Sequence, residues 1–447
     1  MRIVVTKLGG AVLSDTEGFL RAVRLINEDP ARKYVVVSAP GKRDRADTKV
    51  TDLLASLKDP ALRTENIERV RERFLTIAKE LSLSEEVLEE IETTCTAISD
   101  QLQGEVSEGA LEFVMSRGEY LSAQILSAAL KWPCIDPGDV VRFTTHGRFI
   151  DRPADLSLPE RAVIPGFYGK DQNGKVWLLP RDGSDITGAC IAVIAQADLY
   201  EVGKDVAGIF PANPTLVEAP QQPIRVLTYG QAEEMTYRGE SVLHDQAISL
   251  LQGPRIPVRI FSVTSPEDSP DTYIVPEDDP RIISDQVLIG IGEEKDFTMF
   301  ELERAGMNAS RHFTFKLLGV LSDFSIAYDH IATGKNVLSL VVRNKELAGN
   351  TAEVVEAIKK ACRAEVKVTE NLASICVVGT HLGSHPKVIG GLLQALEALK
   401  TETPSDPKIY WHEQSGTGTS IIIGVATSSL PQAIPLLYDY MESLKTS

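Results

Sequence analysis

A lysine followed by two glycines interrupts the apolar start of the chain. Lys7 ends a run of β-branched residues, and Gly9 and Gly10 precede a stretch with the apolar spacing of a helix. Glycines in such a turn let backbone N–H groups approach an anion, and the positive N-terminus of the next helix points to the same place. With the cation of Lys7, this segment is suited to bind phosphate groups. Alone it is more often a tight turn, and the chain has neither GxxxxGK[ST] nor GxGxxG here.

A second strand, glycine turn and helix lies near the middle of the chain. Arg181 precedes the predicted helix, Ser184 could cap it, and Asp185 stands in its first turn. A plain N-cap would account for the serine and the aspartate. An arginine, an acid and a glycine bend at the carboxyl end of a strand also describe the polar edge of an active site in an open α/β sheet.

Two further segments place polar residues beside apolar elements. Arg117 and Glu119 precede the apolar face of a predicted helix, where the helix dipole favours an acid without any function. The segment 202–214 is a strand followed by a loop with Gly208, Phe210 and two prolines. Taken singly, each of these four segments is more often structural than functional.

The elements around these segments alternate between strands and helices. Strand-like runs at 2–8, 33–41 and 256–263 accompany helical stretches, the longest of which covers residues 49–130. This alternation predicts an open, mainly parallel sheet between helices. The stretch 263–280 is rich in Pro, Asp and Ser, as is typical of a domain boundary.

Beyond this boundary the order strand, helix, strand, strand, helix occurs twice in shorter units. Such a repeat predicts two small α+β modules in tandem. We therefore expect a first domain at 1–275 and two modules at 284–365 and 366–447.

The composition of the 447 residues is that of a globular protein, with 43% hydrophobic and 24% charged residues. The net charge of -17 disfavours binding to nucleic acid. The 5 cysteines are scattered and form no CxxC, so we expect reduced thiols in a cytoplasmic protein. No apolar run has membrane-spanning length, and the N-terminus is interpreted as a first strand and not as a signal peptide.

In their order along the chain, six motifs resemble the aspartate kinases of the amino-acid kinase superfamily. They read KLGG, VVVSAPGK with DTKVTDLL, SRGEYLSAQIL, RDGSDITGA, GKDVAGIFPANP and GESVLHDQAI. Farther on, MNASRHFTFKLLGVLSDFSIAYDHIAT and WHEQSGTGTSIIIGV are similar to the two regulatory ACT modules of that family. The resemblance covers nearly the whole chain. It implies an amino-acid-kinase-like sheet domain followed by two ferredoxin-like ACT modules.

The resemblance implies that ATP, with magnesium, phosphorylates the side-chain carboxylate of L-aspartate, the first step of lysine, threonine and methionine synthesis. A carboxylate is already nucleophilic at neutral pH, so the site must mainly neutralise charge and align two anions. Lys7 resembles the lysine that stabilises the transferred phosphoryl group. Asp185 matches an aspartate that would orient this lysine and help to hold magnesium.

The resemblance also assigns the binding residues. Arg181 matches the arginine that grips the substrate α-carboxylate, and Glu119 matches the acid that receives the α-amino group. The substrate-binding residues implied are Ser38, Glu119, Arg181 and Ser184. The nucleotide-binding residues implied are Lys7, Gly9, Gly10, Lys204, Asp205, Gly208, Ile209 and Phe210.

For the ACT modules, the resemblance implies pairing between two chains into a homodimer or a larger assembly. A regulatory amino acid, such as lysine or threonine, would bind at that interface. The positions that match effector contacts are Met307, Ser310, Phe313, Thr314 and Asp329. An apolar core is the alternative place for Met307 and Phe313.

The nucleotide side of the expected site departs from the usual residues of the family at five positions, namely Ala11, Val12, Ala207, Thr215 and Ser241. Lys204 or Lys42 could replace the missing positive charge. The departures leave two alternatives open. One is a related kinase that acts on another amino acid or carboxylate, and the other is a regulatory pseudokinase that only senses amino acids.

Overall fold

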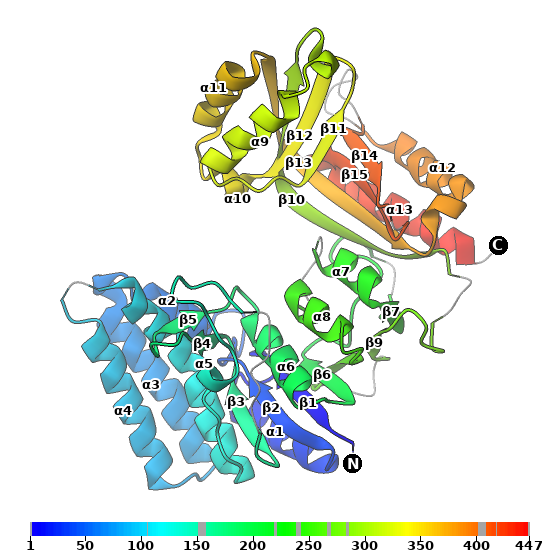
Figure 1. Cartoon of the computed structure of the whole chain (residues 1–447). Helices are drawn as coiled ribbons and strands as arrows, with labels where there is room; N and C mark the ends of the chain where they lie inside the picture. Colours follow the sequence, from blue (N-terminus) through cyan, green and yellow to red (C-terminus); the bar gives the residue numbers. More distant parts are fainter. Residues whose placement is uncertain are drawn as a thin grey trace. The chain divides into compact units, whose positions relative to one another are not determined.

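The computed structural model describes residues 2–104, 106–150, 158–218, 221–237, 243–265, 270–282, 286–400, 408–416 and 418–445. These residues form two compact units, each described by itself below (Figure 1). The first unit contains the described residues of 2–210, 221–237 and 243–282. The second contains those of 211–218 and all those from 286 onward, so a short internal segment of the chain joins the second unit.

The first unit is built on a seven-stranded sheet with the order β3-β2-β1-β6-β8-β9-β7. Its strands are β1 (Val4–Leu8), β2 (Arg32–Val37), β3 (Ala162–Pro165), β6 (Leu199–Lys204), β7 (Val226–Thr228), β8 (Val258–Ser262) and β9 (Thr272–Val275). Strands β3, β2, β1, β6 and β8 are mutually parallel, and β9 runs antiparallel to β8. The predicted open, mainly parallel sheet is confirmed. Strand β9 lies inside 263–280, so this expected boundary segment contributes a strand to the sheet.

Helices cover this sheet. They are α1 (Thr16–Glu28), α2 (Val50–Ser56), α3 (Arg63–Glu80), α4 (Glu85–Gln101), α5 (Glu108–Leu130), α6 (Gly183–Ile194), α7 (Tyr229–Tyr237) and α8 (Asp245–Gln252). Strands β4 (Tyr168–Lys170) and β5 (Val176–Leu178) form a separate two-stranded hairpin. The helical stretch predicted at 49–130 is four successive helices, α2 to α5. Short 3₁₀ turns occupy Pro60–Leu62, Pro137–Asp139, Met307–Ala309, Leu382–Ser384, Leu396–Ala398 and Thr427–Ser429.

The main core of the first unit lies between helices α1 to α5 and one face of β1 and β2. Val35 and Val37, two residues apart on β2, both belong to it, as side-chain alternation along a strand requires. Helix α6 packs on β1 and β2 and contacts α8 (Figure 1). Helix α1 begins at Asp15, whose carboxylate accepts the N–H of Gly18 at 2.8 Å as an N-cap. The loops after β1 and β2 are thus held by firmly packed elements.

A buried ion-pair network joins four neighbouring strands of this sheet. Glu201 on β6 has a side chain 3% exposed and accepts from Arg32 of β2 at 2.7 Å and from Arg259 of β8 at 2.8 Å. The hydroxyl of Thr6 on β1 donates to the same carboxylate at 3.1 Å. One carboxylate therefore compensates charges across the centre of the sheet.

We expect Glu201→Gln to lower the free energy of unfolding by about 3 kcal/mol, because removing one partner leaves buried guanidinium charge uncompensated. Urea denaturation of the full chain measures the effect. The matched control is Glu160→Gln, since Glu160 pairs with Lys33 at 3.2 Å but is 77% exposed. Its change should stay within about 0.5 kcal/mol. Equal losses in the two variants would contradict a special role for the Glu201 network.

The second unit contains a six-stranded antiparallel sheet with the order β11-β12-β10-β13-β15-β14. The strands are β10 (Leu288–Glu303), β11 (His330–Thr333), β12 (Val337–Arg343), β13 (Glu365–Gly379), β14 (Trp411–Gln414) and β15 (Ser420–Ala426). The helices are α9 (Phe313–Asp323), α10 (Asn344–Leu347), α11 (Thr351–Cys362), α12 (Pro386–Ala395) and α13 (Leu430–Lys445). The two α+β modules predicted in tandem share this one sheet.

Two long strands, β10 and β13, connect the two halves of the second unit. The start of β10 pairs with the end of β13 and belongs to a core with Leu288, Ile375 and Ile423. The end of β10 pairs with the start of β13 and belongs to a core with Phe300 and Leu340. Each core therefore takes residues from both long strands. The module limits at 284–365 and 366–447 stay a prediction.

Within the part of the chain that the structure describes, no helix has both the length and the apolar character needed to cross a membrane.

Candidate active site

Two lysines meet one buried carboxylate at the carboxyl ends of β1 and β6. The Nζ atom of Lys7 lies 2.6 Å from Oδ1 of Asp185, and the Nζ atom of Lys204 lies 3.8 Å from Oδ2. The side chains of Lys7, Asp185 and Lys204 are 4%, 0% and 14% exposed. This trio carries one net positive charge in a chain whose overall charge is -17. It is therefore a local attractor for anions.

Close packing at the start of α6 places Asp185. The backbone N–H of His244 donates to Oδ2 of Asp185 at 3.3 Å, and the hydroxyl of Tyr200 donates to its carbonyl at 3.0 Å. A Cβ atom at Gly188 would lie 2.3 Å from that hydroxyl, so only glycine lets the helix approach β6 this closely. Ser184 is buried in the first turn and is not the N-cap. That position belongs to Asp182, which has a left-handed φ of 63° and makes no side-chain cap hydrogen bond.

Burial and the neighbouring charges shift the pKa values of Asp185 and Lys204. Burial raises the pKa of Asp185, but the charges of Lys7 and Lys204 and the bonds from Lys7 and His244 outweigh it, so the pKa lies below its usual value. Burial lowers the pKa of Lys204, the charge of Asp185 partly offsets this, and the charge of Lys7 adds to it. Asp185 therefore stays ionised at neutral pH.

The two glycines after β1 serve different purposes. The N–H of Gly9 donates to the carbonyl of Gly203 on β6 at 3.0 Å, so it already has a partner. A Cβ atom at Gly10 would lie 2.5 Å from the carbonyl oxygen of Ala39, so Gly10 permits contact with the loop after β2. Among the described residues, no backbone acceptor faces the N–H groups of Gly10 and Ala11. These two groups, and not that of Gly9, are available to a phosphate oxygen.

Glu119 on α5 is a buried acid with spare acceptor capacity. Its side chain is 4% exposed, and its Oε2 atom has no hydrogen-bond partner among the described residues. Burial raises its pKa to about 7, although a hydrogen bond from the backbone of Ala39 and the charges of Lys7 and Arg117 oppose the shift. A buried acceptor of this kind needs a donor. A ligand ammonium group would supply one.

The other predicted substrate-binding residues are Ser38, Ser184 and Arg181, and they follow or begin elements of the first unit. Ser38 follows β2, is half-buried, and donates its N–H to the carbonyl of Leu8 at 3.2 Å, next to Lys7 on β1. Ser184 packs so closely on Gly166 that a Cβ atom there would lie 2.6 Å from the serine side chain. Arg181 is exposed and makes no ion pair with any described residue. Its guanidinium remains open to a ligand.

The predicted nucleotide loop is anchored by β9. The N–H of Ile209 donates to Oγ1 of Thr272 at 3.0 Å, and a Cβ atom at Gly208 would lie 2.2 Å from that oxygen. Asp205 is exposed and Phe210 is half-buried. The anchor explains the glycine without any ligand.

The positions that depart from the family pattern, and the two lysines suggested as substitutes, lie in different parts of the chain. Lys42 is exposed, and Thr215 belongs to the segment that joins the second unit. Val12 lies in the main core of the first unit. Ser241 lies outside the described residues. Only Lys204 of the two suggested substitute cations contacts Asp185.

The predicted effector positions have three kinds of environment. Met307 and Phe313 are 2% and 3% exposed and lie in a core of the second unit, so the alternative of a core position is confirmed for both. Ser310 is half-buried and Thr314 is exposed. The carboxylate of Asp329 is 1% exposed and lies 3.5 Å from the guanidinium of Arg343, which also pairs with Glu294 at 2.9 Å.

Comparison with known proteins agrees with this geometry. The amino acid kinase family matches residues 2–262, which include every member of the lysine–aspartate trio. Aspartokinase 3 of Bacillus subtilis (strain 168) is 32% identical over 456 residues, which cover 97% of this chain and 97% of that protein. The chain belongs to the aspartate kinases of the amino acid kinase family.

Solved aspartate kinases share the whole fold. The crystal structure of the Clostridium acetobutylicum aspartate kinase, described as an allosteric enzyme, is 30% identical, has a TM-score of 0.79, and covers 99% of this chain and 100% of its own. Escherichia coli aspartokinase III in complex with aspartate and ADP has a TM-score of 0.82 at 22% identity, over 98% and 99% of the two chains. The lysine-sensitive aspartokinase 3 of E. coli (strain K12) is 26% identical over 412 residues, 85% of this chain and 88% of that protein.

Several contacts of this aspartate kinase were not predicted from its sequence. The N–H of His244 and the hydroxyl of Tyr200 fix Asp185, although His244 lies within a motif that carries the family resemblance. The buried Arg73 on α3 contacts the loops after β1 and β2. A charged residue on the apolar face of an amphipathic helix was the available signal.

Proposed function

We propose that the chain transfers the γ-phosphoryl group of ATP to the side-chain carboxylate of L-aspartate and forms 4-phospho-L-aspartate. The observation that carries the proposal is the pair of lysines that share the single carboxylate of Asp185, at 2.6 and 3.8 Å. Two anions must meet in this reaction, and the surplus positive charge of the trio offsets their repulsion. No general base is needed, because the attacking carboxylate is already ionised.

Lys7 stabilises the transferred phosphoryl group in this proposal. Asp185 holds the amine of Lys7 by the short contact, so the orientation of this amine is fixed before the nucleotide arrives. Lys204 compensates for the phosphate-binding lysine that is absent at Ser241. The free N–H groups of Gly10 and Ala11 add donors on the same side.

Glu119 and Arg181 recognise the two charges common to all α-amino acids. The unpartnered Oε2 atom of Glu119 accepts a bond from the α-ammonium group. The exposed fork of Arg181 binds the α-carboxylate with two parallel bonds. Ser38, which follows β2, and Ser184, in the first turn of α6, supply hydroxyls that contact the reacting groups.

Magnesium would arrive with the nucleotide. The described residues contain no cluster of three acidic, histidine or cysteine side chains that could hold a metal ion. Both carboxylate oxygens of Asp185 face other groups, Oδ1 facing Lys7 and Oδ2 facing Lys204 and His244. Magnesium is commonly held by one or two carboxylates, phosphates and several waters. We therefore propose that the phosphates carry the ion and that Asp185 contacts it through water.

The decisive experiment supplies purified protein with ATP, magnesium, L-aspartate and hydroxylamine. Aspartyl hydroxamate should form, since hydroxylamine traps the acyl phosphate. Product with another amino acid or carboxylate, but not with aspartate, would support the related-kinase alternative. No turnover with any acceptor, together with binding of lysine or threonine, would support the regulatory pseudokinase.

We further propose that the reaction takes place in the cytoplasm, as the first step towards lysine, threonine and methionine. Regulation by an amino acid, lysine or threonine, would act through the second unit. The lysine-sensitive E. coli relative supports this regulation.

Self-association through the ACT modules belongs to the same proposal. Four large apolar side chains are exposed along 315–337 of the second unit, namely Phe315 at 75%, Tyr328 at 49%, Val337 at 37% and Leu318 at 36%. Phe315 and Leu318 are three positions apart on α9 and share a helix face. A second copy of the chain would bury such a surface.

Phe315→Ser is expected to shift the full chain from dimer or larger assembly towards monomer by about tenfold in dissociation constant, because a buried aromatic anchor is lost. Light scattering after size-exclusion chromatography, over a range of concentrations, measures the shift. The control is Leu62→Ser, since Leu62 is 39% exposed but lies in the first unit. A shift towards monomer in Leu62→Ser alone would indicate that the interface lies on the first unit.

A further inference from the structure

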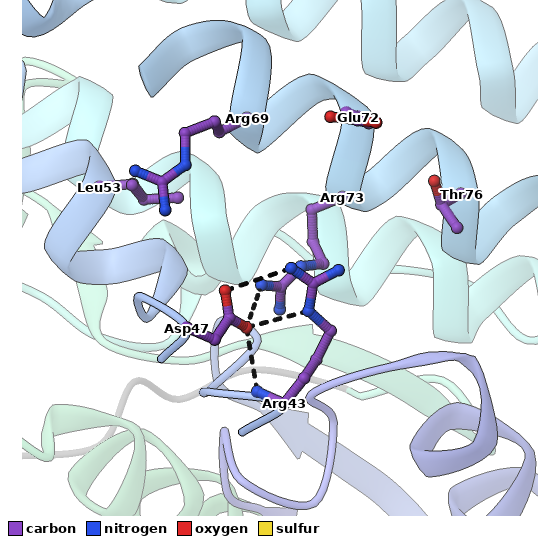
Figure 2. Close-up of a pocket in the computed structure, with 7 residues that line it drawn as sticks. All are labelled: Arg43, Asp47, Leu53, Arg69, Glu72, Arg73 and Thr76. Carbon is purple, nitrogen blue, oxygen red and sulfur yellow. Dashed lines mark hydrogen bonds and ion pairs between the residues drawn. The ribbon is translucent and has the colours of Figure 1, made fainter. Parts of the chain in front are cut away.

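A cavity beside helix α3 is lined by three arginines and two acids that the proposed reaction does not use. It measures about 210 Å³ and is lined by Arg43, Asp47, Leu53, Arg69, Glu72, Arg73 and Thr76. Figure 2 shows the guanidinium groups of Arg43 and Arg73 meeting at the carboxylate of Asp47, whereas Arg69 lies apart from this contact. The cavity marks the place where α3 meets the loop after β2.

Arg73 is an unusual residue for its position. It stands on the inward face of α3 with Val70, Phe74 and Ile77, and it is only 6% exposed. Burying a guanidinium group is unfavourable unless its donors and its charge are compensated. Here Nη1 donates to the carbonyls of Ser14 at 3.0 Å and Gly41 at 3.2 Å, and Nη2 pairs with Asp47.

Those two carbonyls belong to the loops that border the lysine–aspartate trio. Ser14 ends the turn after β1, which begins with Gly9 and Gly10. Gly41 lies in the loop after β2, and its N–H donates to the carbonyl of Gly10 at 2.7 Å. A Cβ atom at Gly41 would lie 2.8 Å from that same oxygen. Arg73 thus binds, from outside the site, two loops that contact each other directly.

The loop after β2 also connects Arg73 with the expected substrate site. Its Ala39 packs directly on α5 beside Glu119, since a Cβ atom at Gly118 would lie 2.8 Å from the Cβ of Ala39, and the backbone of Ala39 also lowers the pKa of the Glu119 carboxyl by hydrogen bonding. The loop after β1 has independent support, because Gly9 is bonded to β6 and Val12 closes the turn at 3.1 Å. In the loop after β2, Arg73 bonds both the carbonyl of Gly41 and the carboxylate of Asp47, and the latter also accepts bonds from Arg43. A loss of Arg73 should therefore affect the aspartate side more than the nucleotide side.

We propose that Arg73 is a positioning residue for aspartate binding, which fixes the loop after β2 so that Ala39 holds Glu119 in place. The inference rests on the proposed aspartate kinase function. Asp47 assists by compensating the charge of Arg73 and by accepting bonds from the backbone and side chain of Arg43 at 3.0 Å. Arg73 itself touches no reacting group.

Steady-state kinetics of Arg73→Met in the full chain test this role. KM for aspartate should rise at least tenfold, while KM for ATP changes less than about twofold, equivalent to a loss of about 1.4 kcal/mol on the aspartate side alone. Arg73→Lys keeps the charge but cannot span two carbonyls and a carboxylate, so it should rescue little. Added guanidinium ion at low millimolar concentration should partly restore the KM of Arg73→Met.

The matched control is Arg69→Met, on the same helix and at the same cavity, which is exposed and whose side-chain bonds to described residues go to Thr48 and Asn66. It should leave both KM values unchanged. If Arg73→Met matches this control, or raises both KM values equally, the inference is wrong. Should Arg73→Met fail to fold, Asp47→Asn decides, with an expected rise of at least threefold in KM for aspartate alone. Wild-type protein without aspartate phosphorylation would instead refute the proposed function itself.

Discussion

Lys7→Met is expected to lower kcat for aspartate phosphorylation by roughly 10²- to 10³-fold. The amine of Lys7 is fixed by a 2.6 Å contact with Asp185 and is 4% exposed, so its charge acts in a site largely free of water. A preorganised charge at the transferred phosphoryl group stabilises the transition state more than the bound substrates. The hydroxamate assay with both substrates saturating measures this loss in kcat.

Two other lysines separate this role from a general loss of charge. Lys204→Met should mainly raise KM for ATP, by about tenfold, because Lys204 lies 3.8 Å from Asp185 and is more exposed than Lys7. Lys33→Met removes a lysine whose side chain is 6% exposed on β2 and pairs with Glu160, and it should leave kcat within about twofold. Equal losses of kcat in the Lys7 and Lys204 variants would contradict the assignment of Lys7 to the transferred phosphoryl group.

Strand and helix types could be predicted over most of the first unit because the local pattern decides them there. Val35, Val36 and Val37 are continuous apolar residues, as a strand buried on both faces requires, and they lie in β2, between β3 and β1. The carboxyl ends of parallel strands lie at one edge. Lys7 and Lys204, in the last two residues of β1 and of β6, could therefore be expected on the same side of the sheet.

Contacts between distant segments could not be predicted in this way. The apolar pattern of residues 288–303 predicts a strand, β10. It does not predict that the start and the end of this strand belong to two different hydrophobic cores. The sequence around Gly9 likewise does not predict that its N–H donates to the carbonyl of Gly203, 194 positions later. This bond leaves the N–H groups of Gly10 and Ala11 as the available donors. Hydrophobic periodicity and secondary-structure propensity describe one segment of the chain, whereas its contacts with distant segments depend on tertiary packing.

The roles of polar residues near helix starts were equally hard to predict. Serine is a residue type that often caps helices, but here the N-cap is Asp182, whose backbone is left-handed. Ser184 instead packs against Gly166. Met307 and Phe313 match effector positions in the family resemblance, yet both are buried in the core. In each case a side chain that could bind a ligand has a packing partner in the chain.

Glu119→Gln is expected to raise KM for aspartate by roughly 10²-fold, since a buried charge pair lost on one side costs about 3 kcal/mol. The amide keeps the shape of the side chain and can still accept the N–H of Ala39, so the packing of α5 remains. What it lacks is the negative charge that meets the α-ammonium group. KM for ATP should change less than about twofold, because the proposed nucleotide contacts come from other loops. The control Glu112→Gln removes an acid of the same helix, paired with Lys175 at 3.5 Å, and should leave KM for aspartate unchanged.

The pH dependence of kcat/KM for aspartate gives a second, independent test of Glu119. Burial raises its pKa to about 7, so below this pH the free protein holds mostly the neutral acid, which cannot pair with an ammonium group. The value of kcat/KM at saturating ATP should therefore rise with pH, about tenfold per unit below 7, and become level above it. Glu119→Gln should remove this rise, and Glu112→Gln should keep it. A rise that persists in Glu119→Gln would assign the titration to another group and leave the ammonium without its proposed partner.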